Sequence, residues 1–200
     1  MANTQSAYGF AHFGYLPGGA VDYQLTPVSI RAAYSTLIGF GDPVVKENTA
    51  SAFMALATTA NVTVNILQGI FQGCWYTPTG SYPQWSPFWP GASATNGTAY
   101  IINAPNALFR VAALLTSCAS GQIGGAVNFT GGAPATTGGG FSSATIDMSS
   151  IATAGTAVSS LPFKIVSLYP GIGNGSDATT PYGWMIVTFN SQIYKITGGF

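Results

Sequence analysis

Hydrophobic and polar residues alternate in several short stretches of the chain, which is the pattern of a β-strand with one buried face. Turn-forming Gly, Pro, Asn and Ser residues separate these stretches. The last stretch, residues 182–198, predicts either one long strand or a hairpin that turns at Asn190 and Ser191. The other predicted strands cover residues 21–30, 62–66, 69–76, 99–102, 107–114 and 161–170.

This pattern predicts a mainly β protein whose body, residues 21–200, is a single β-barrel or β-sandwich. Evidence for helices is thin. Residues 29–38 and 50–60 could each form a short helix, but the second stretch is rich in Thr and turn residues. Residues 121–155 are rich in Gly, Ser, Thr and Ala, and they predict a long loop region within the body.

Residues 1–20 predict an extended N-terminal arm. Aromatic residues recur between glycines in this segment, at Tyr8, Phe10, Phe13 and Tyr15. Aromatic side chains provide a large contact area for their size and are frequent at interfaces. We therefore expect the arm to lie along a neighbouring molecule, with these side chains as its contact points.

The chain carries very little charge. Charged residues make up 5% of its 200 residues, whereas a typical soluble domain has about 25%. Five Lys and Arg residues balance five Asp and Glu residues, so the formal net charge is zero. Such a surface gives little protection from self-association. We expect other protein subunits to cover it, including further copies of the chain in a homo-oligomer.

The distribution of charge also argues against two kinds of partner. Nucleic-acid binding needs clustered basic residues, and no such cluster occurs, so we expect no nucleic-acid partner. No stretch approaches the roughly 20 consecutive apolar residues of a transmembrane helix, and we expect no membrane partner. The first ten residues lack the basic and apolar regions of a signal peptide, which predicts synthesis in a cytoplasm. The basic residues lie singly, at Arg31, Lys46, Arg110, Lys164 and Lys195.

Candidate catalytic groups are sparse. His12 is the one histidine, and a polar contact within the arm is its favoured role over a Ser-His-Asp site. No spacing of His, Cys, Asp or Glu predicts a metal site, and no motif predicts a cofactor. Cys74 and Cys118 predict two buried free thiols rather than a disulfide, and Asp42, before a proline, is placed to cap a turn. We expect a protein that is not an enzyme and has no cofactor.

The densest aromatic segment is SYPQWSPFWPG, residues 81–91. Its prolines stiffen the backbone, which lowers the entropy lost on docking. Its rings either contact a partner or close the end of the protein's own barrel, and one tryptophan could serve in each way. The aromatic residues of the segment are Tyr82, Trp85, Phe88 and Trp89.

Arg110 lies within a predicted strand, so its neighbours Phe109 and Val111 face the opposite side of the sheet. Exposure to solvent is the default for Arg110, and at an assembly interface it would bind a partner's carboxylate. The candidate interface residues are therefore Tyr8, Phe10, Phe13, Tyr15, Tyr82, Trp85, Phe88, Trp89 and Arg110.

The order of motifs from about Asn3 to about Tyr194 resembles that of head decoration, or cement, proteins of tailed bacteriophages. The resemblance implies a β-rich body, without catalysis or cofactor, that binds the major capsid protein on the exterior of an HK97-type virion and clamps neighbouring subunits together. The chain carries less charge than is usual in this group, which leaves its place in the shell open. The motifs are NTQSAYGF, GDPVV, GIFQGCWY, WSPFWPG, AYIINAPNALFRVAA, PFKIVSLYP and WMIVTFNSQIY.

Two alternatives stay open. The first is another virion component, such as a shell, tail or fibre subunit, although neither a long spine helix nor an internal repeat is evident. The second is a carbohydrate-binding module or glycosidase fragment that stacks sugars on Tyr82, Trp85 and Trp89. Sugar platforms generally combine aromatic rings with carboxylates or amides, and Gln84 is the one such group close to these rings.

Overall fold

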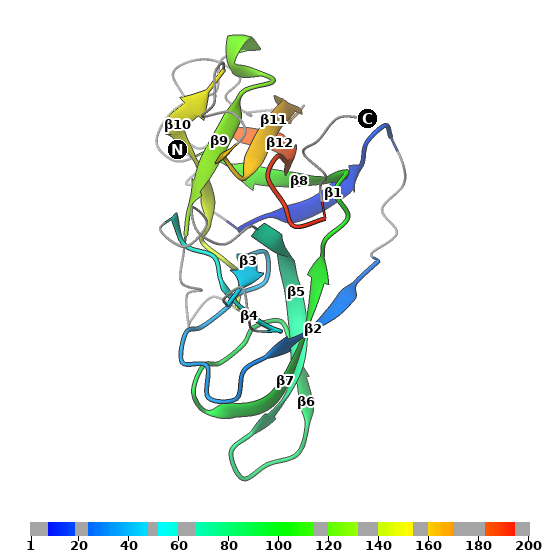
Figure 1. The fold of residues 1–200 in the computed structure, drawn as a ribbon, viewed down its shortest axis with the longest axis vertical. Coiled ribbons are helices and arrows are strands. Elements are labelled where there is room, and N and C mark those ends of the chain that lie inside the picture. Colours follow the sequence, from blue (N-terminus) through cyan, green and yellow to red (C-terminus); the bar gives the residue numbers. More distant parts are fainter. Residues whose placement is uncertain are drawn as a thin grey trace, which may run out of the picture.

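The computed structural model describes residues 8–18, 24–47, 52–59, 67–113, 120–131, 140–153, 160–169 and 183–194. In these stretches the chain forms twelve β-strands and one short 3-10 helix, η1 (Ser120–Gln122). The prediction of a mainly β fold is confirmed, because a closed five-stranded barrel lies beside a second sheet. These two parts follow one another along the longest axis of the molecule (Figure 1).

The second sheet, which we call sheet A, has six strands in the order β1-β8-β12-β11-β9-β10, and all neighbouring pairs are antiparallel. Side chains alternate between its two faces as predicted for β8, where Phe109 and Val111 are buried and Arg110 points away from them. The strands are β1 (Ala11–Tyr15), β8 (Ala107–Ala112), β9 (Ala126–Thr130), β10 (Thr145–Ala152), β11 (Phe163–Leu168) and β12 (Trp184–Phe189).

The barrel follows the strand order β3-β4-β2-β7-β5, and pairing of β3 with β5 closes it. The β2–β4 pair is parallel, and the other barrel pairs are antiparallel. Strand β6 (Gln84–Ser86) extends the sheet beyond β5, and the β5–β6 hairpin reaches the end of the molecule farthest from sheet A (Figure 1). The barrel strands are β2 (Thr26–Ile30), β3 (Pro43–Lys46), β4 (Phe53–Leu56), β5 (Leu67–Pro78) and β7 (Ala94–Ile102).

Both helix predictions are wrong over residues 29–38 and 52–58, where the structure shows strands and turns. Residues 53–56 form β4, which pairs with β2 and β3 and so buries Met54 inside the barrel. After β2 ends at Ile30, the chain turns through residues that include Ala33 with a φ of 58°. Strand pairing in the closed barrel outweighs the weak local helix propensity of these stretches.

The predicted loop region, residues 121–155, contains two strands of sheet A. Strand β9 buries Val127 and Phe129, and β10 buries Ile146 and Met148, so each follows the two-residue period of a half-buried strand. The glycines and threonines around these short runs concealed the pattern. The prediction of one long loop is therefore wrong for residues 126–130 and 145–152, and residues 132–139 and 154–155 lie outside the described part of the chain.

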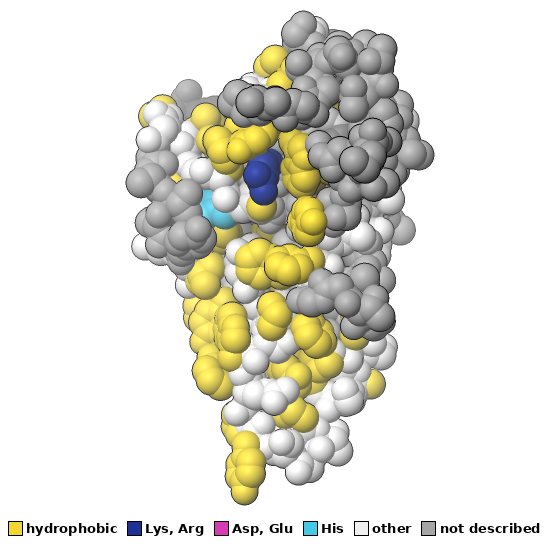
Figure 2. All heavy atoms as spheres, turned by 180° about the vertical axis from the view of Figure 1, so that it is seen from behind, with side chains coloured by type: hydrophobic (Ala, Val, Ile, Leu, Met, Phe, Trp, Pro, Cys, Tyr) yellow, Lys and Arg dark blue, Asp and Glu magenta, His cyan; other side chains and the backbone are white. Residues whose placement is uncertain are grey.

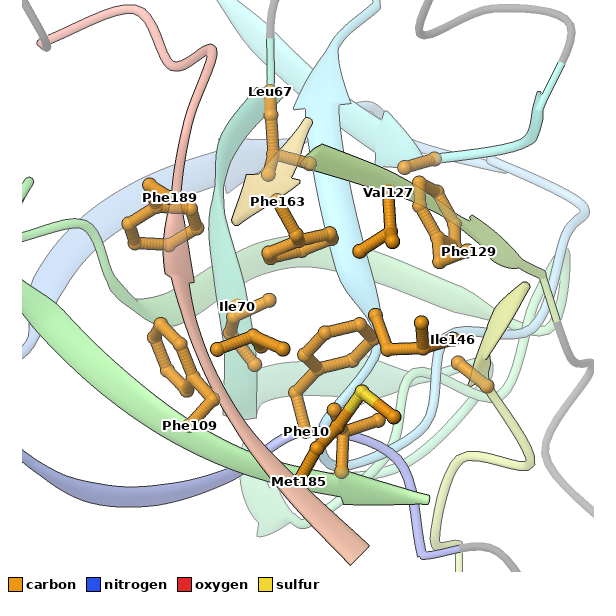
Figure 3. Packing of buried hydrophobic residues seen from close by; sticks show 14 of the residues in the cluster. Phe10, Leu67, Ile70, Phe109, Val127, Phe129, Ile146, Phe163, Met185 and Phe189 are labelled. Carbon is orange, nitrogen blue, oxygen red and sulfur yellow. The ribbon is translucent and has the colours of Figure 1, made fainter. Parts of the chain in front are cut away.

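The described part of the predicted N-terminal arm belongs to the body. Strand β1 is the edge strand of sheet A and pairs with β8. The preceding residue, Phe10, is fully buried and stacks on Phe163 with 4.4 Å between ring centroids, while Phe109 and Phe129 meet its ring edge-on (Figure 3). An extended arm over residues 8–18 is thus not observed, and residues 1–7 lie outside the described residues.

Strand β5 connects the two hydrophobic cores. Its first eight residues are all buried, because the barrel covers one face and sheet A covers the other. Leu67 and Ile70 pack into the core beneath sheet A, together with Phe10 (Figure 3). Phe71 and Cys74 point into the barrel. The buried stretch includes the polar residues Gln68 and Gln72, so the double burial does not show in the sequence as a continuous apolar run.

A turn at residues 39–42 joins the barrel to sheet A. The Asp42 carboxylate is fully buried and accepts hydrogen bonds from the Gly39 N–H, at 2.7 Å, and from the Ser142 hydroxyl. The prediction that Asp42 caps a turn is confirmed. Burial raises the pKa of the Asp42 carboxyl from its ordinary value of 3.8 to about 7, although the hydrogen bonds from Ser142 and Gly39 act in the opposite direction.

The backbone of this turn bonds to three other segments. The Gly41 carbonyl accepts the Phe10 N–H at 2.9 Å, just before β1. The Gly41 N–H donates to the Phe71 carbonyl of β5 at 2.8 Å, and the Ser142 N–H donates to the Phe40 carbonyl at 2.9 Å, just before β10. The turn therefore holds the barrel and both edges of sheet A in one hydrogen-bonded unit.

Stability should fall as pH rises because of Asp42. Between the unfolded pKa of 3.8 and the folded pKa of about 7, the folded state holds a proton that the unfolded state has lost. The free energy of unfolding should decrease through this window by roughly 4 kcal/mol and then level off. Urea unfolding from pH 4 to pH 8 measures this slope, and Asp42→Asn should remove most of it. An equal slope in both proteins would contradict the assignment.

Replacing Phe10 should test whether the N-terminal segment is part of the body. Phe10→Ala opens a cavity among three phenylalanine rings and should cost about 3–5 kcal/mol of stability. Phe13→Ala is the matched control three residues away, on an exposed side chain, and should change stability by less than about 1 kcal/mol. Equilibrium urea unfolding measures both. Similar small effects from the two changes would mean that the segment is a detachable arm after all.

Candidate interaction surface

Large hydrophobic side chains are exposed on both parts of the molecule. Scattered apolar residues are normal on a protein surface, but contiguous apolar patches mark interaction sites. Figure 2 shows hydrophobic side chains along the whole length of one face, with a basic side chain among them and no Asp or Glu of the described residues in view. The exposed large residues are Tyr8, Phe13, Leu16, Phe53, Trp75, Tyr82, Trp85, Ile123, Phe141, Ile193 and Tyr194.

On sheet A, aromatic rings surround Arg110. Its Cζ atom lies over the Trp184 ring, 4.9 Å from the centroid, and over the Tyr169 ring, 5.3 Å from the centroid. Such cation–π contacts stabilise by about 0.5–1 kcal/mol at exposed sites and by more where water is excluded. Strand pairing produces this arrangement, because Ile186 lies opposite Arg110 and Trp184 is two residues along β12.

Three further rings enlarge this group. Tyr8 lies nearly parallel to Trp184, with 6.5 Å between centroids, and meets Phe141 edge-on at 6.1 Å. Phe13 meets Tyr169 edge-on at 5.7 Å. These contacts bring together the segment before β1, the strand β1, the end of β11, the start of β12, and the segment before β10. We call the group the Arg110 cluster; it consists of Tyr8, Phe13, Arg110, Phe141, Tyr169 and Trp184.

A second group of rings covers the outer side of the barrel, and we call it the Trp75–Trp85 patch. The two tryptophans form a cross-strand pair between β5 and β6, with 6.2 Å between centroids, and both are nearly half exposed. Tyr100 of β7 lies 5.6 Å from the Trp85 ring. Gly73 makes room for that ring, because a Cβ atom at Gly73 would lie 2.5 Å from it and the φ of this glycine is +127°.

The aromatic segment 81–91 passes from solvent into the barrel. Tyr82 is 86% exposed in the β5–β6 hairpin, Trp85 belongs to the outer patch, and Phe88 is partly buried against Gly140. Trp89 is fully buried, and its indole N–H donates to the Tyr34 carbonyl at 2.9 Å. The two tryptophans thus serve differently, one on the surface and one in the barrel core.

The structure places the nine predicted interface residues in three kinds of environment. Tyr8, Phe13, Tyr82 and Trp85 are exposed, whereas Tyr15, Phe88 and Arg110 are partly buried. Phe10 and Trp89 lie in the hydrophobic cores, and this burial removes them from the set of residues that a partner can touch. The interface prediction therefore needs correction at these two positions. Each lies in a segment with several aromatic residues, and the sequence did not show which of them point into the core.

Four aromatic residues of the two ring groups were not among the predicted interface residues: Trp75, Phe141, Tyr169 and Trp184. Trp75 was predictable, because Cys74 and Tyr76 on either side are buried and a strand alternates its faces. Tyr169 and Trp184 come together because β11 and β12 are antiparallel, so the end of one strand lies beside the start of the other. No local sequence pattern predicts that these two strands pair. Likewise, no local pattern predicts that Phe141 lies beside Tyr8.

The described residues show few reactive groups. Cys74 is a free, buried thiol as predicted, and burial raises its pKa to about 12, while Cys118 lies outside the described residues. His12 contacts the Gly14 carbonyl at 3.2 Å and the Tyr15 ring. In the described part of the chain, no three His, Cys, Asp or Glu residues lie close enough to bind a metal ion. No helix among the described stretches has the length and apolar character needed to span a membrane.

Comparisons with known proteins give no assignment, because the chain matches no protein-family model, no curated protein and no solved structure. The functional interpretation therefore depends on the Arg110 cluster and the Trp75–Trp85 patch themselves.

The two tryptophans of segment 81–91 should respond differently to the same substitution. Trp89→Ser removes the largest side chain of the barrel core and should cost more than about 3 kcal/mol of stability. Trp85→Ser should leave the protein folded and reduce self-association, because it removes exposed apolar surface. Thermal unfolding and sedimentation velocity measure the two effects. Undiminished self-association of the Trp85 variant would show that the patch does not drive association.

Proposed function

We propose that this chain is a structural virion protein that decorates and stabilises a bacteriophage capsid. The observation that carries the proposal is the outer surface, on which exposed aromatic rings gather on both parts of the molecule and charges are few. Such a surface suits permanent contact with other subunits, because burying apolar area drives association. The resemblance of the motif order to head decoration proteins points to the exterior of an HK97-type shell.

The arrangement of the two ring groups fits a clamping role. The Arg110 cluster lies on sheet A, and the Trp75–Trp85 patch lies on the barrel. Sheet A and the barrel follow one another along the longest axis of the molecule (Figure 1). One copy therefore has two separate surfaces with which to contact neighbouring capsid subunits or further copies of itself. The shared core beneath sheet A makes the body stiff, so a contact at one end holds the other in place.

The carbohydrate-binding alternative loses part of its basis. It required Tyr82, Trp85 and Trp89 to form one stacking platform, and Trp89 is fully buried in the barrel.

The number of copies per virus particle distinguishes decoration from the alternative of another virion component, such as a shell, tail or fibre subunit. Quantitative mass spectrometry of purified particles should find a copy number comparable with that of the shell subunit if the protein decorates or builds the shell, and a much lower number for a tail or fibre part.

Binding to undecorated heads tests the proposal directly. Purified protein should saturate the heads, and its affinity should fall by less than tenfold, about 1.4 kcal/mol, between low and high salt. The physical reason is that apolar contacts dominate and few charge pairs exist to be screened. Titration at about 0.05 M and about 1 M salt, followed by pelleting of the heads, measures this. Absence of binding at both salt concentrations would overturn the proposed function.

A further inference from the structure

Arg110 has aromatic neighbours but no acidic one among the described residues. Two rings contact its guanidinium, at 4.9 Å and 5.3 Å, and no ion pair or hydrogen bond joins it to another residue of the described stretches. Arg31 shows the contrast, because it pairs with Glu47 at 2.8 Å. The charge of Arg110 is therefore held among apolar groups without a described counter-charge.

Trp184 and Tyr169 lie beside the guanidinium of Arg110. The groups with which the guanidinium can bind a further partner are its N–H donors, which lie in the guanidinium plane. Two such donors match the two oxygens of a carboxylate. A partner that docks on these rings would exclude water from the partly buried Arg110, which strengthens the attraction and offsets part of the cost of desolvating the charge.

We propose that the Arg110 cluster is the docking site of a single carboxylate, an Asp or Glu flanked by apolar residues, on the capsid shell subunit. The inference rests on the proposed function for the identity of the partner. The rings supply apolar contact area and Arg110 supplies the charge complement, so the occupant has to combine both properties. In the proposed function, this contact between Arg110 and a carboxylate would orient the protein on the shell.

Other ligand classes fit less well. A phosphate-rich ligand would need several cations, and Arg110 is the one cation of the cluster. A sugar would need free ring faces, whereas Tyr8 packs against both Trp184 and Phe141, and Phe40 packs against Phe141. The cluster is a continuous apolar surface with one charge, which favours a folded protein partner.

Matched substitutions on sheet A test the inference. Arg110→Met keeps the aliphatic stem against the rings and removes the charge, and it should weaken binding to undecorated heads by at least about tenfold. Lys164→Met removes an exposed cation from β11 of the same sheet and should change affinity by less than about twofold. Thermal unfolding confirms that both variants are folded. Unchanged affinity of the Arg110→Met variant, with normal binding of the wild type, would overturn this inference and leave the proposed function standing. Failure of the wild type to bind heads would overturn both.

A cross-linking experiment identifies the carboxylate. Arg110→Lys places a primary amine in the cluster, and carbodiimide treatment of decorated heads joins an amine to a contacting carboxylate as an amide, with loss of water. Mass spectrometry of the digest should find residue 110 joined to an Asp or Glu of the shell subunit. A link to a second copy, a link to Asp177 of the same chain, or no link despite full decoration would each overturn the proposal. Lys164 in the same sample is the internal control, with no link to the shell expected.

Discussion

Residues 39–42 have to satisfy hydrogen-bonding groups from three directions, because they lie where the barrel, the start of β1 and the start of β10 meet. The Asp42 carboxyl makes this possible, since one of its oxygens closes the turn onto Gly39 and the other holds Ser142. A carboxyl in this place cannot be hydrated, so its neutral form is favoured. An apolar residue would avoid that cost but would leave the Gly39 N–H and the Ser142 hydroxyl buried without acceptors.

This joint determines which parts of the chain remain available to partners. The Phe10 backbone bonds to the turn and its ring packs in the core. These contacts hold the following strand, β1, in sheet A. Strand β5 is similarly committed on both faces over its first eight residues. The face of each sheet that points away from the cores stays accessible to solvent, and the exposed aromatic side chains lie on it. The two exposed ring groups are thus a consequence of how the two cores share their strands.

The sequence predicted the class of fold and, in whole or in part, six of the twelve strands (β2, β5, β7, β8, β11 and β12), because period-two alternation is a local property. It also predicted the outward direction of Arg110, the turn at Asp42 and the burial of Cys74. It failed where pairing outweighs local composition: β4 has a helix-like sequence, and β9 and β10 lie among glycines. It also could not show that Phe10 is buried and Phe13 exposed. The bulge between His12 and Gly14 shifts the register of β1 on β8, and no local pattern reveals it.

The low charge of the chain has a consequence for specificity. Apolar contact is non-directional, so a surface made of rings alone binds strongly but orients a partner poorly. A single cation held among rings changes this, because mismatched placement leaves a desolvated charge without its complement. In the proposed binding to capsid subunits, the two ring groups would provide contact area and hence affinity, and the Arg110 guanidinium would provide register. Additional charges would add little orientation and would weaken the apolar contact by retaining water.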